Sequence, residues 1–173
     1  MIRKTDLNKD FMRIFIDADA FPNVIRDILI KASLRLDIPL IFVANKPLRL
    51  ENLPNLSLIL VPGGPDVADD RIAELVQPGD LAITADIPLA DRVVTKNAFA
   101  MNPRGMLYTE HNIKDRLAMR DLLSGLRDNG MITGGPAQFS RKDRQAFANQ
   151  LDRFLVRQLK NENETTRKPV HKP

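Results

Sequence analysis

The chain has 173 residues, of which 43% are hydrophobic and 28% are charged, a composition typical of one soluble globular domain. It contains no cysteine, which argues against a disulfide-stabilised fold, and its apolar runs are too short to span a membrane. The N-terminal sequence MIRKTDLNKDF lacks the apolar region of a secretion signal, so we expect a cytoplasmic location. Most of the net charge of +4 comes from the two ends of the chain, so the total charge alone does not identify a nucleic-acid-binding protein.

Strand and helix patterns alternate along the chain. We predict strands at 12–18, 38–44, 56–61, 81–84 and 98–101, and helices at 22–37, within 63–80, and at 87–97, 110–130 and 140–160. Several strands are continuous apolar runs, as expected for strands buried on both faces. The alternation therefore predicts an α/β fold with a mostly parallel sheet and helices on both faces, followed by two long C-terminal helices.

The composition changes at both ends of the chain. We expect a flexible N-terminus at 1–11, a single α/β domain at 12–159 and a disordered basic tail at 160–173, because the tail has almost no apolar residues to bury.

Aspartates gather where the predicted strands end. Asp17 and Asp19 follow the first strand, Asp69 and Asp70 follow the third, and Asp86 follows the fourth. Because the carboxyl ends of parallel strands meet at one edge of a sheet, we expect these acids to share a rim. The rim would also carry Asp66, and the polar residues Asn45 and Thr84 follow or end their strands at the same edge.

Several carboxylates held this close together remain ionised only beside a compensating cation. Mg²⁺ or Mn²⁺ is the predicted ion, because both prefer oxygen ligands, whereas zinc would require the histidines or cysteines that the chain nearly lacks. Such a site suits activation of water for attack on phosphorus. Asp19, Asp66 and Asp86 are each explained at least as well as helix N-caps. Asp17 is not, because it lies at the strand end before any cap position, and Asp69 and Asp70 in succession are more than one cap requires.

The charge pattern is compatible with an enzyme that binds a polyanion. Residues 66–91 carry seven acids, with Arg71 and the adjoining Arg92 as the only nearby bases, whereas residues 104–157 carry ten bases and six acids. Solvent-exposed helix faces would give the same counts.

Linked motifs give a more specific indication. FIDADAFPNVIRDIL, PGGPDVADDRIAELV, GDLAITADIPLADRVV, NPRGMLYT, RLAMRDLL and TGGPAQFSRKDRQAF together resemble the uncharacterised YaiI/YqxD family, which is similar to PIN-type nuclease domains. The resemblance covers residue 13 to about residue 158. It implies a three-layer α/β/α sandwich and a carboxylate cluster that binds Mg²⁺ or Mn²⁺ for hydrolysis of single-stranded RNA.

The resemblance also implies roles for individual residues. Asp17, Asp69 or Asp70, and Asp86 stand at the positions of metal-binding and catalytic carboxylates, and Asp19 is an additional acid. Asn45, Thr84 and Arg104 are candidates for binding substrate phosphates, although strand-end capping or a turn explains each of them equally well.

Two other functions are compatible with these residues. The Asp17 and Asp19 pair resembles the nucleophile and general acid of haloacid dehalogenase phosphatases, although the later motifs of that class come in a different order here. The chain could also be a non-catalytic RNA-binding or interaction module, in which arginines rather than its few aromatic residues contact the backbone. No feature of the sequence predicts an oligomeric state.

Overall fold

The computed structural model describes residues 11–18, 21–135 and 137–167. Within these residues, six strands form one sheet in the order β3-β2-β1-β4-β5-β6, and only β6 runs antiparallel to its neighbour. The strands are β1 (Ile14–Asp17), β2 (Leu40–Ala44), β3 (Leu56–Leu60), β4 (Leu81–Ile83), β5 (Phe99–Met101) and β6 (Leu107–Tyr108). The helices are α1 (Asn23–Leu36), α2 (Val67–Leu75), α3 (Ile87–Thr95), α4 (Glu110–Asp128) and α5 (Arg141–Arg167).

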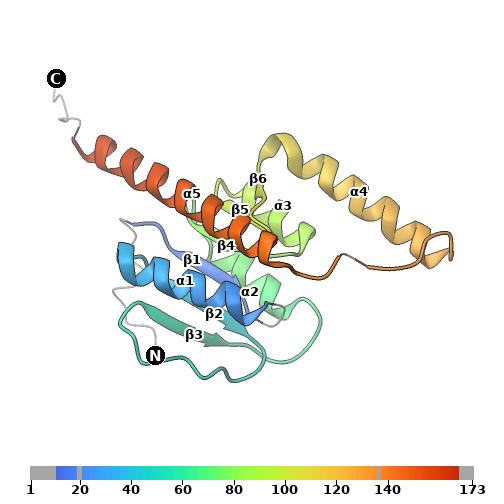
Figure 1. Ribbon diagram of the computed structural model, residues 1–173, viewed down its shortest axis with the longest axis horizontal. Helices are drawn as coiled ribbons and strands as arrows, with labels where there is room; N and C mark the ends of the chain where they lie inside the picture. The colour runs from blue at the N-terminus through green and yellow to red at the C-terminus, as the bar shows by residue number, and fades with distance from the viewer. Residues whose placement is uncertain (1–10, 19–20, 136, 168–173) are drawn as a thin grey trace.

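The predicted three-layer α/β/α arrangement is confirmed. Helices α1 and α5 cover one face of the sheet, and α2 and α3 cover the other (Figure 1). Helix α4 packs against α3 at its N-terminal end and then extends away from the body. No helix among the described residues is long and apolar enough to cross a membrane.

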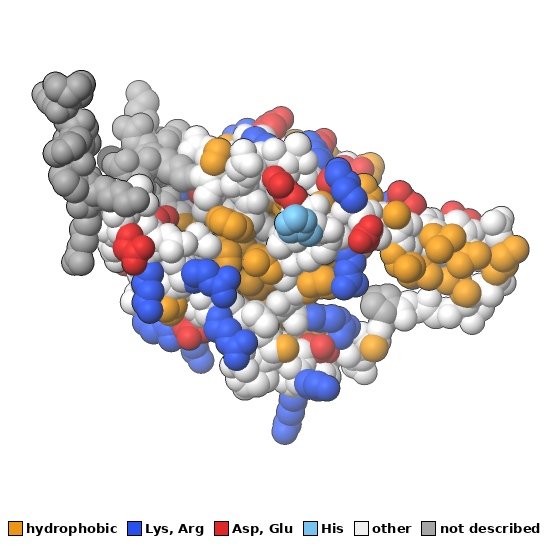
Figure 2. Space-filling view, turned by 90° about the horizontal axis from the view of Figure 1, so that it is seen from above, with side chains coloured by type: hydrophobic (Ala, Val, Ile, Leu, Met, Phe, Trp, Pro, Cys, Tyr) orange, Lys and Arg blue, Asp and Glu red, His pale blue; other side chains and the backbone are white. Residues whose placement is uncertain are grey.

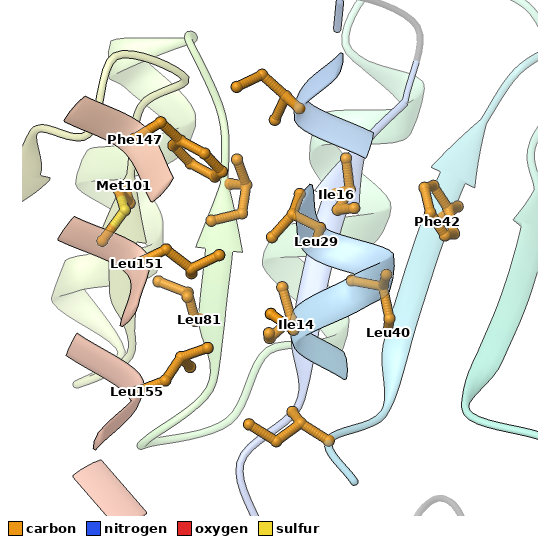
Figure 3. Packing of buried hydrophobic residues seen from close by; sticks show 14 of the residues in the cluster. Ile14, Ile16, Leu29, Leu40, Phe42, Leu81, Met101, Phe147, Leu151 and Leu155 are labelled. Atoms are coloured by element: carbon orange, nitrogen blue, oxygen red, sulfur yellow. The ribbon is translucent and has the colours of Figure 1, made fainter. Parts of the chain in front are cut away.

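Alternation along β1 divides the core into two apolar clusters. Ile14 and Ile16 pack beneath α1, where Figure 3 shows them beside Leu29, and Leu151 of α5 lies beside Leu81 in the same cluster. Phe15 points to the opposite face and packs with residues of α2 and α3. Because successive side chains of a strand point to opposite faces, Asp17 lies on the same face as Phe15.

The turn between β5 and β6 packs closely against the backbone of α5. Gly105 has a φ of +87°, and a Cβ at this position would lie 2.8 Å from the carbonyl oxygen of Ala146 in α5. Arg104 adds an ion pair of 2.7 Å with Asp143 at the start of the same helix. These contacts fix the beginning of α5 over the sheet.

Two features differ from the sequence-based expectations. The short strand β6 was not predicted, because two residues are too few to show an alternating pattern. Helix α5 continues to Arg167, where a disordered tail was expected from residue 160. An established helix can add polar residues at its end without burying them, because elongation costs much less than nucleation. Residues 168–173 and 1–10 lie outside the described residues.

Candidate metal centre

The strand order reverses between β1 and β4. From β1 the chain moves outward to β2 and β3, and it then crosses back to β4 on the other side of β1. In open α/β sheets, ligands bind where the strand order reverses in this way. The residues that end β1 and follow β4 therefore lie at the position where the fold favours a binding site.

Asp17 is the last residue of β1 and pairs in register with Val43 of β2. Its side chain is half-buried and lies on the α2 and α3 face of the sheet. The next residue continues the ladder, since the Ala18 amide donates to the Val43 carbonyl at 2.9 Å. The main chain thus holds Asp17 at the carboxyl edge of the sheet.

Asp69 lies in the first turn of α2, where the helix N-terminus favours a negative charge. The pKa of Asp69 is nevertheless raised to about 6, first by burial and then by the nearby carboxylates of Asp17, Asp86, Asp66 and Asp70, in that order of effect. The ordering shows that acids from β1 and from the start of α3 act on Asp69 more strongly than its own neighbours along the chain. The fold therefore brings the predicted acids together at one rim.

Asp86 is the N-cap of α3, as the capping interpretation predicted. Its Oδ1 accepts a hydrogen bond of 2.7 Å from the Leu89 amide. Its own amide donates to Oγ1 of Thr84 at 3.0 Å, and Thr84 is fully buried. Thr84 therefore shapes the turn that positions Asp86, and its role in binding substrate phosphate stays a prediction.

Asp70 and Asp69 differ in their surroundings although they are adjacent in sequence. Asp70 is exposed, and its Oδ1 lies 2.7 Å from Nη1 of Arg92 on α3. Asp66 occupies the N-cap position of α2 with a φ of 61°, and its side chain makes no capping hydrogen bond. Of these acids, Asp69 is the one whose ionisation is coupled most clearly to Asp17 and Asp86.

The other predicted site residues are Asn45, Arg104 and Asp19, and their surroundings differ. Asn45 follows β2 at the same edge of the sheet and is half-buried. The guanidinium of Arg104 binds Asp143 and also donates to the carbonyl of Ala137, so it links the turn after β5 to the start of α5. Asp19 lies outside the described residues, and the Asp17 and Asp19 pair is therefore not described.

Tyr108 is a rim residue that the sequence did not indicate. Burial raises the pKa of its hydroxyl, a hydrogen bond from Asn102 and the positive charge of Arg116 lower it, and the Asp86 carboxylate raises it. Tyr108 is thus influenced by the charges of both Arg116 and Asp86. The two-residue strand that carries Tyr108 has no detectable pattern in the sequence.

The donor set suits a hard divalent cation. The carboxylates at the rim supply only oxygen ligands, and a cation would relieve the repulsion that raises the pKa of Asp69. Among the described residues, however, no three acids or histidines are close enough together to form a complete metal-binding group. Mg²⁺ commonly binds through one or two carboxylates and keeps several waters, and a site of that kind needs no preformed triad.

Comparison with known proteins identifies the family. A family model described as "Uncharacterized BCR, YaiI/YqxD family" matches residues 15–157. The chain belongs to the YaiI/YqxD family. The match to the YaiI/YqxD model begins within β1 and ends within α5, so it includes the whole rim described above.

Curated relatives resemble this YaiI/YqxD chain over nearly their whole length. The UPF0178 protein of Trichlorobacter lovleyi is 54% identical over 149 residues, covering 86% of this chain and 97% of the relative. That of Solidesulfovibrio magneticus is 57% identical over 144 residues, covering 83% and 96%. That of Hahella chejuensis is 52% identical over 150 residues, covering 87% and 100%. These descriptions name no activity for the YaiI/YqxD family, so a function has to be argued from the site.

Proposed function

We propose that this protein is a divalent-metal-dependent phosphodiester hydrolase that acts on RNA. The observation that carries the proposal is the placement of three acids at the carboxyl edge of the sheet, where Asp17 ends β1, Asp69 lies in the first turn of α2 and Asp86 caps α3. The raised pKa of Asp69 agrees with this placement. Carboxylates are rarely gathered at one edge without a ligand that compensates their repulsion, and perturbed pKa values cluster at functional sites.

Asp17, Asp69 and Asp86 are the candidate metal ligands, and Mg²⁺ or Mn²⁺ is the proposed ion, bound directly by one or two of these carboxylates and through its waters by the remainder. The β-ladder fixes Asp17, and the Leu89 amide together with Thr84 fixes Asp86. Asp70 is proposed as a supporting acid, because Arg92 already neutralises it. When bound, the ion would activate a water and stabilise charge on the phosphate oxygens.

Binding of Mn²⁺ measured by calorimetry tests the site. Asp17→Asn and Asp69→Asn should remove binding, because each deletes a proposed charged ligand. Asp152→Asn is the matched control: it removes an aspartate of α5 that pairs with Arg35 on the other face of the sheet and should bind Mn²⁺ like the original protein. Circular dichroism would establish that all variants are folded. Unchanged Mn²⁺ affinity in Asp17→Asn would rule out the proposed ligands.

Cleavage assays separate the hydrolase from the phosphatase alternative. A labelled single-stranded RNA should be cut in the presence of Mn²⁺ by the original protein and by Asp152→Asn, but not by Asp17→Asn. A covalent phosphate adduct on Asp17, trapped with a fluoride-metal analogue, would instead support the haloacid dehalogenase mechanism and contradict the proposal.

A further inference from the structure

Helix α4 forms an arm that leaves the body of the molecule. Its N-terminal part packs on α3 through the buried Ile113, whereas its C-terminal half extends away from the sheet (Figure 1). Figure 2 shows hydrophobic side chains gathered at this projecting end. Met119 is 53% exposed and Leu122 is 57% exposed, which is unusual for large apolar residues on a regular helix.

Three arginines form a row along one side of this arm. Arg116, Arg120 and Arg127 are all exposed, and at 100° per residue they fall within a sector of about 40° around the helix axis. The row is about 16 Å long at 1.5 Å rise per residue. Arg120 pairs with its neighbour Asp121, and no ion pair within the described part of the chain engages Arg116 or Arg127.

An apolar row lies directly beside the arginines. Met119, Leu122 and Leu126 occupy the adjoining sector of the helix, on the side away from Ile113. The acids Asp121 and Asp128 project on the opposite side of the arginine row, and Asp115 falls in the sector of the apolar row at its inner end. Positive charge and apolar surface are therefore neighbours on the arm, although the charges of the whole helix nearly balance.

The inner end of the arginine row lies where α4 packs on α3, the helix that Asp86 caps. Lys114, two residues before Arg116, pairs with Asp91 of α3 at 2.7 Å, and both Arg116 and Asp86 influence the hydroxyl of Tyr108. A chain of phosphates bound along the row would therefore run toward the helix that carries Asp86.

We infer that the α4 arm binds a single-stranded nucleic acid, with Arg116, Arg120 and Arg127 contacting phosphates and Met119, Leu122 and Leu126 contacting bases. The inference rests on the proposed function, because it assigns to the arm the strand that the rim would hydrolyse. A single strand offers both an anionic backbone and exposed base faces, whereas a duplex keeps its bases stacked inside. Two antiparallel copies of α4 paired through the apolar row would bring arginine against arginine, so a second copy fits less well.

Fluorescence anisotropy with a short labelled single-stranded RNA tests the arm in EDTA, where neither metal binding nor cleavage contributes. Arg116→Gln/Arg120→Gln/Arg127→Gln should weaken binding at least tenfold at low salt. The slope of log affinity against log salt should fall in magnitude by about 2, because each lost contact contributes about 0.7. The matched control, Arg144→Gln/Arg153→Gln/Arg157→Gln, removes three exposed arginines of α5 and should bind like the original protein.

The apolar row requires its own variant. Met119→Ser/Leu122→Ser should weaken binding of the single strand several-fold without changing the salt slope, and the original protein should bind the matching duplex more weakly than the single strand. Equal losses in the α4 and α5 arginine variants would overturn the inference. A change of oligomeric state in Met119→Ser/Leu122→Ser with unchanged RNA affinity would also overturn it, by identifying the row as a self-association surface. Because the arm is tested in EDTA and the metal site by Mn²⁺ calorimetry, loss of arm binding and loss of Mn²⁺ binding are separate results.

Discussion

Arg13 and Asp80 form an ion pair of 2.6 Å that is almost completely buried at the end of the sheet opposite the acidic rim. Asp80 also accepts hydrogen bonds from the amides of Arg13 and Gln77, and Arg13 donates to the carbonyl of Leu75 at the end of α2. The guanidinium lies 5.0 Å from the centroid of the Phe15 ring. This pair ties the beginnings of β1 and β4 to the last turn of α2.

Asp80→Ala should lower the free energy of unfolding by about 3–5 kcal/mol, because it leaves the buried Arg13 charge without its partner. Urea denaturation followed by circular dichroism measures this loss. The control is Asp152→Ala, which breaks an exposed pair with Arg35 and should cost less than about 1 kcal/mol. Similar losses in the two variants would contradict the structural role of the buried pair.

The acidic rim should make stability depend on pH through Asp69. The pKa of Asp69 is raised from 3.8 to about 6, so the folded protein binds its proton more tightly than the unfolded chain. Ionised Asp69 therefore destabilises the fold, and this penalty is absent below pH 3.8, grows as the pH rises to about 6 and then stays constant. Asp69→Asn removes the penalty.

We expect Asp69→Asn to be more stable than the original protein by about 1 kcal/mol at pH 7, after allowance for solvent screening, and equally stable near pH 3.5. Thermal unfolding in a metal-free buffer should show this as a rise in Tm of about 2–4 °C at pH 7 only. Asp70→Asn is the control, since it removes a carboxylate that pairs with Arg92 and should not stabilise the protein. A Tm gain that is the same at both pH values would show that ionisation of Asp69 is not the cause.

Thr84 should affect both stability and the proposed metal site. Thr84→Val removes the buried hydroxyl that accepts a hydrogen bond from the Asp86 amide, which should lower the free energy of unfolding by about 1–3 kcal/mol. It should also weaken Mn²⁺ binding, because Asp86 is no longer held in position. Thr84→Ser keeps the hydroxyl and should preserve Mn²⁺ affinity. Denaturation and calorimetry on the same samples check both effects. If Thr84→Val binds Mn²⁺ as tightly as Thr84→Ser, this hydrogen bond does not position Asp86.

Gly105→Ala should destabilise the protein by more than about 2 kcal/mol, because the new Cβ would meet the Ala146 carbonyl at a positive φ. Gly125→Ala in α4 meets no atom within 4 Å and should be stabilising by up to about 1 kcal/mol. Chemical denaturation of both variants gives the comparison. Equal stabilities would mean that the turn after β5 can move away from α5.

The sequence predicts much of this fold because its strong signals are local. Apolar runs predict β2 and β4, and helical periodicity predicts α1 and α3. The parallel arrangement of the strands then places Asp17, Asp69 and Asp86 at one edge of the sheet. Contacts between distant segments are not predictable in this way. Nothing near Asp70 indicates that Arg92 will neutralise it, and nothing near Arg104 indicates that Asp143 will pair with it.

The different surroundings of Asp69 and Asp70 likewise cannot be predicted without the folded structure. Two adjacent aspartates look equivalent in a sequence, but successive residues of a helix point about 100° apart. One therefore faces Asp17 and Asp86, and the other reaches Arg92 on the surface.

Helix α5 also sets the order in which the molecule can be completed during synthesis. Phe147, Leu151 and Leu155 lie beside Met101 and Leu81 (Figure 3), in the same apolar cluster as Ile14, so the last helix closes a surface that the first strand begins. Until α5 has left the ribosome, the nascent chain must carry one face of its sheet without that cover. Contacts between opposite ends of a chain slow folding, and exposed apolar sheet surface promotes aggregation. A ribosome stalled before residue 147 should therefore hold a chain that chaperones bind, and one stalled well beyond residue 167 should not.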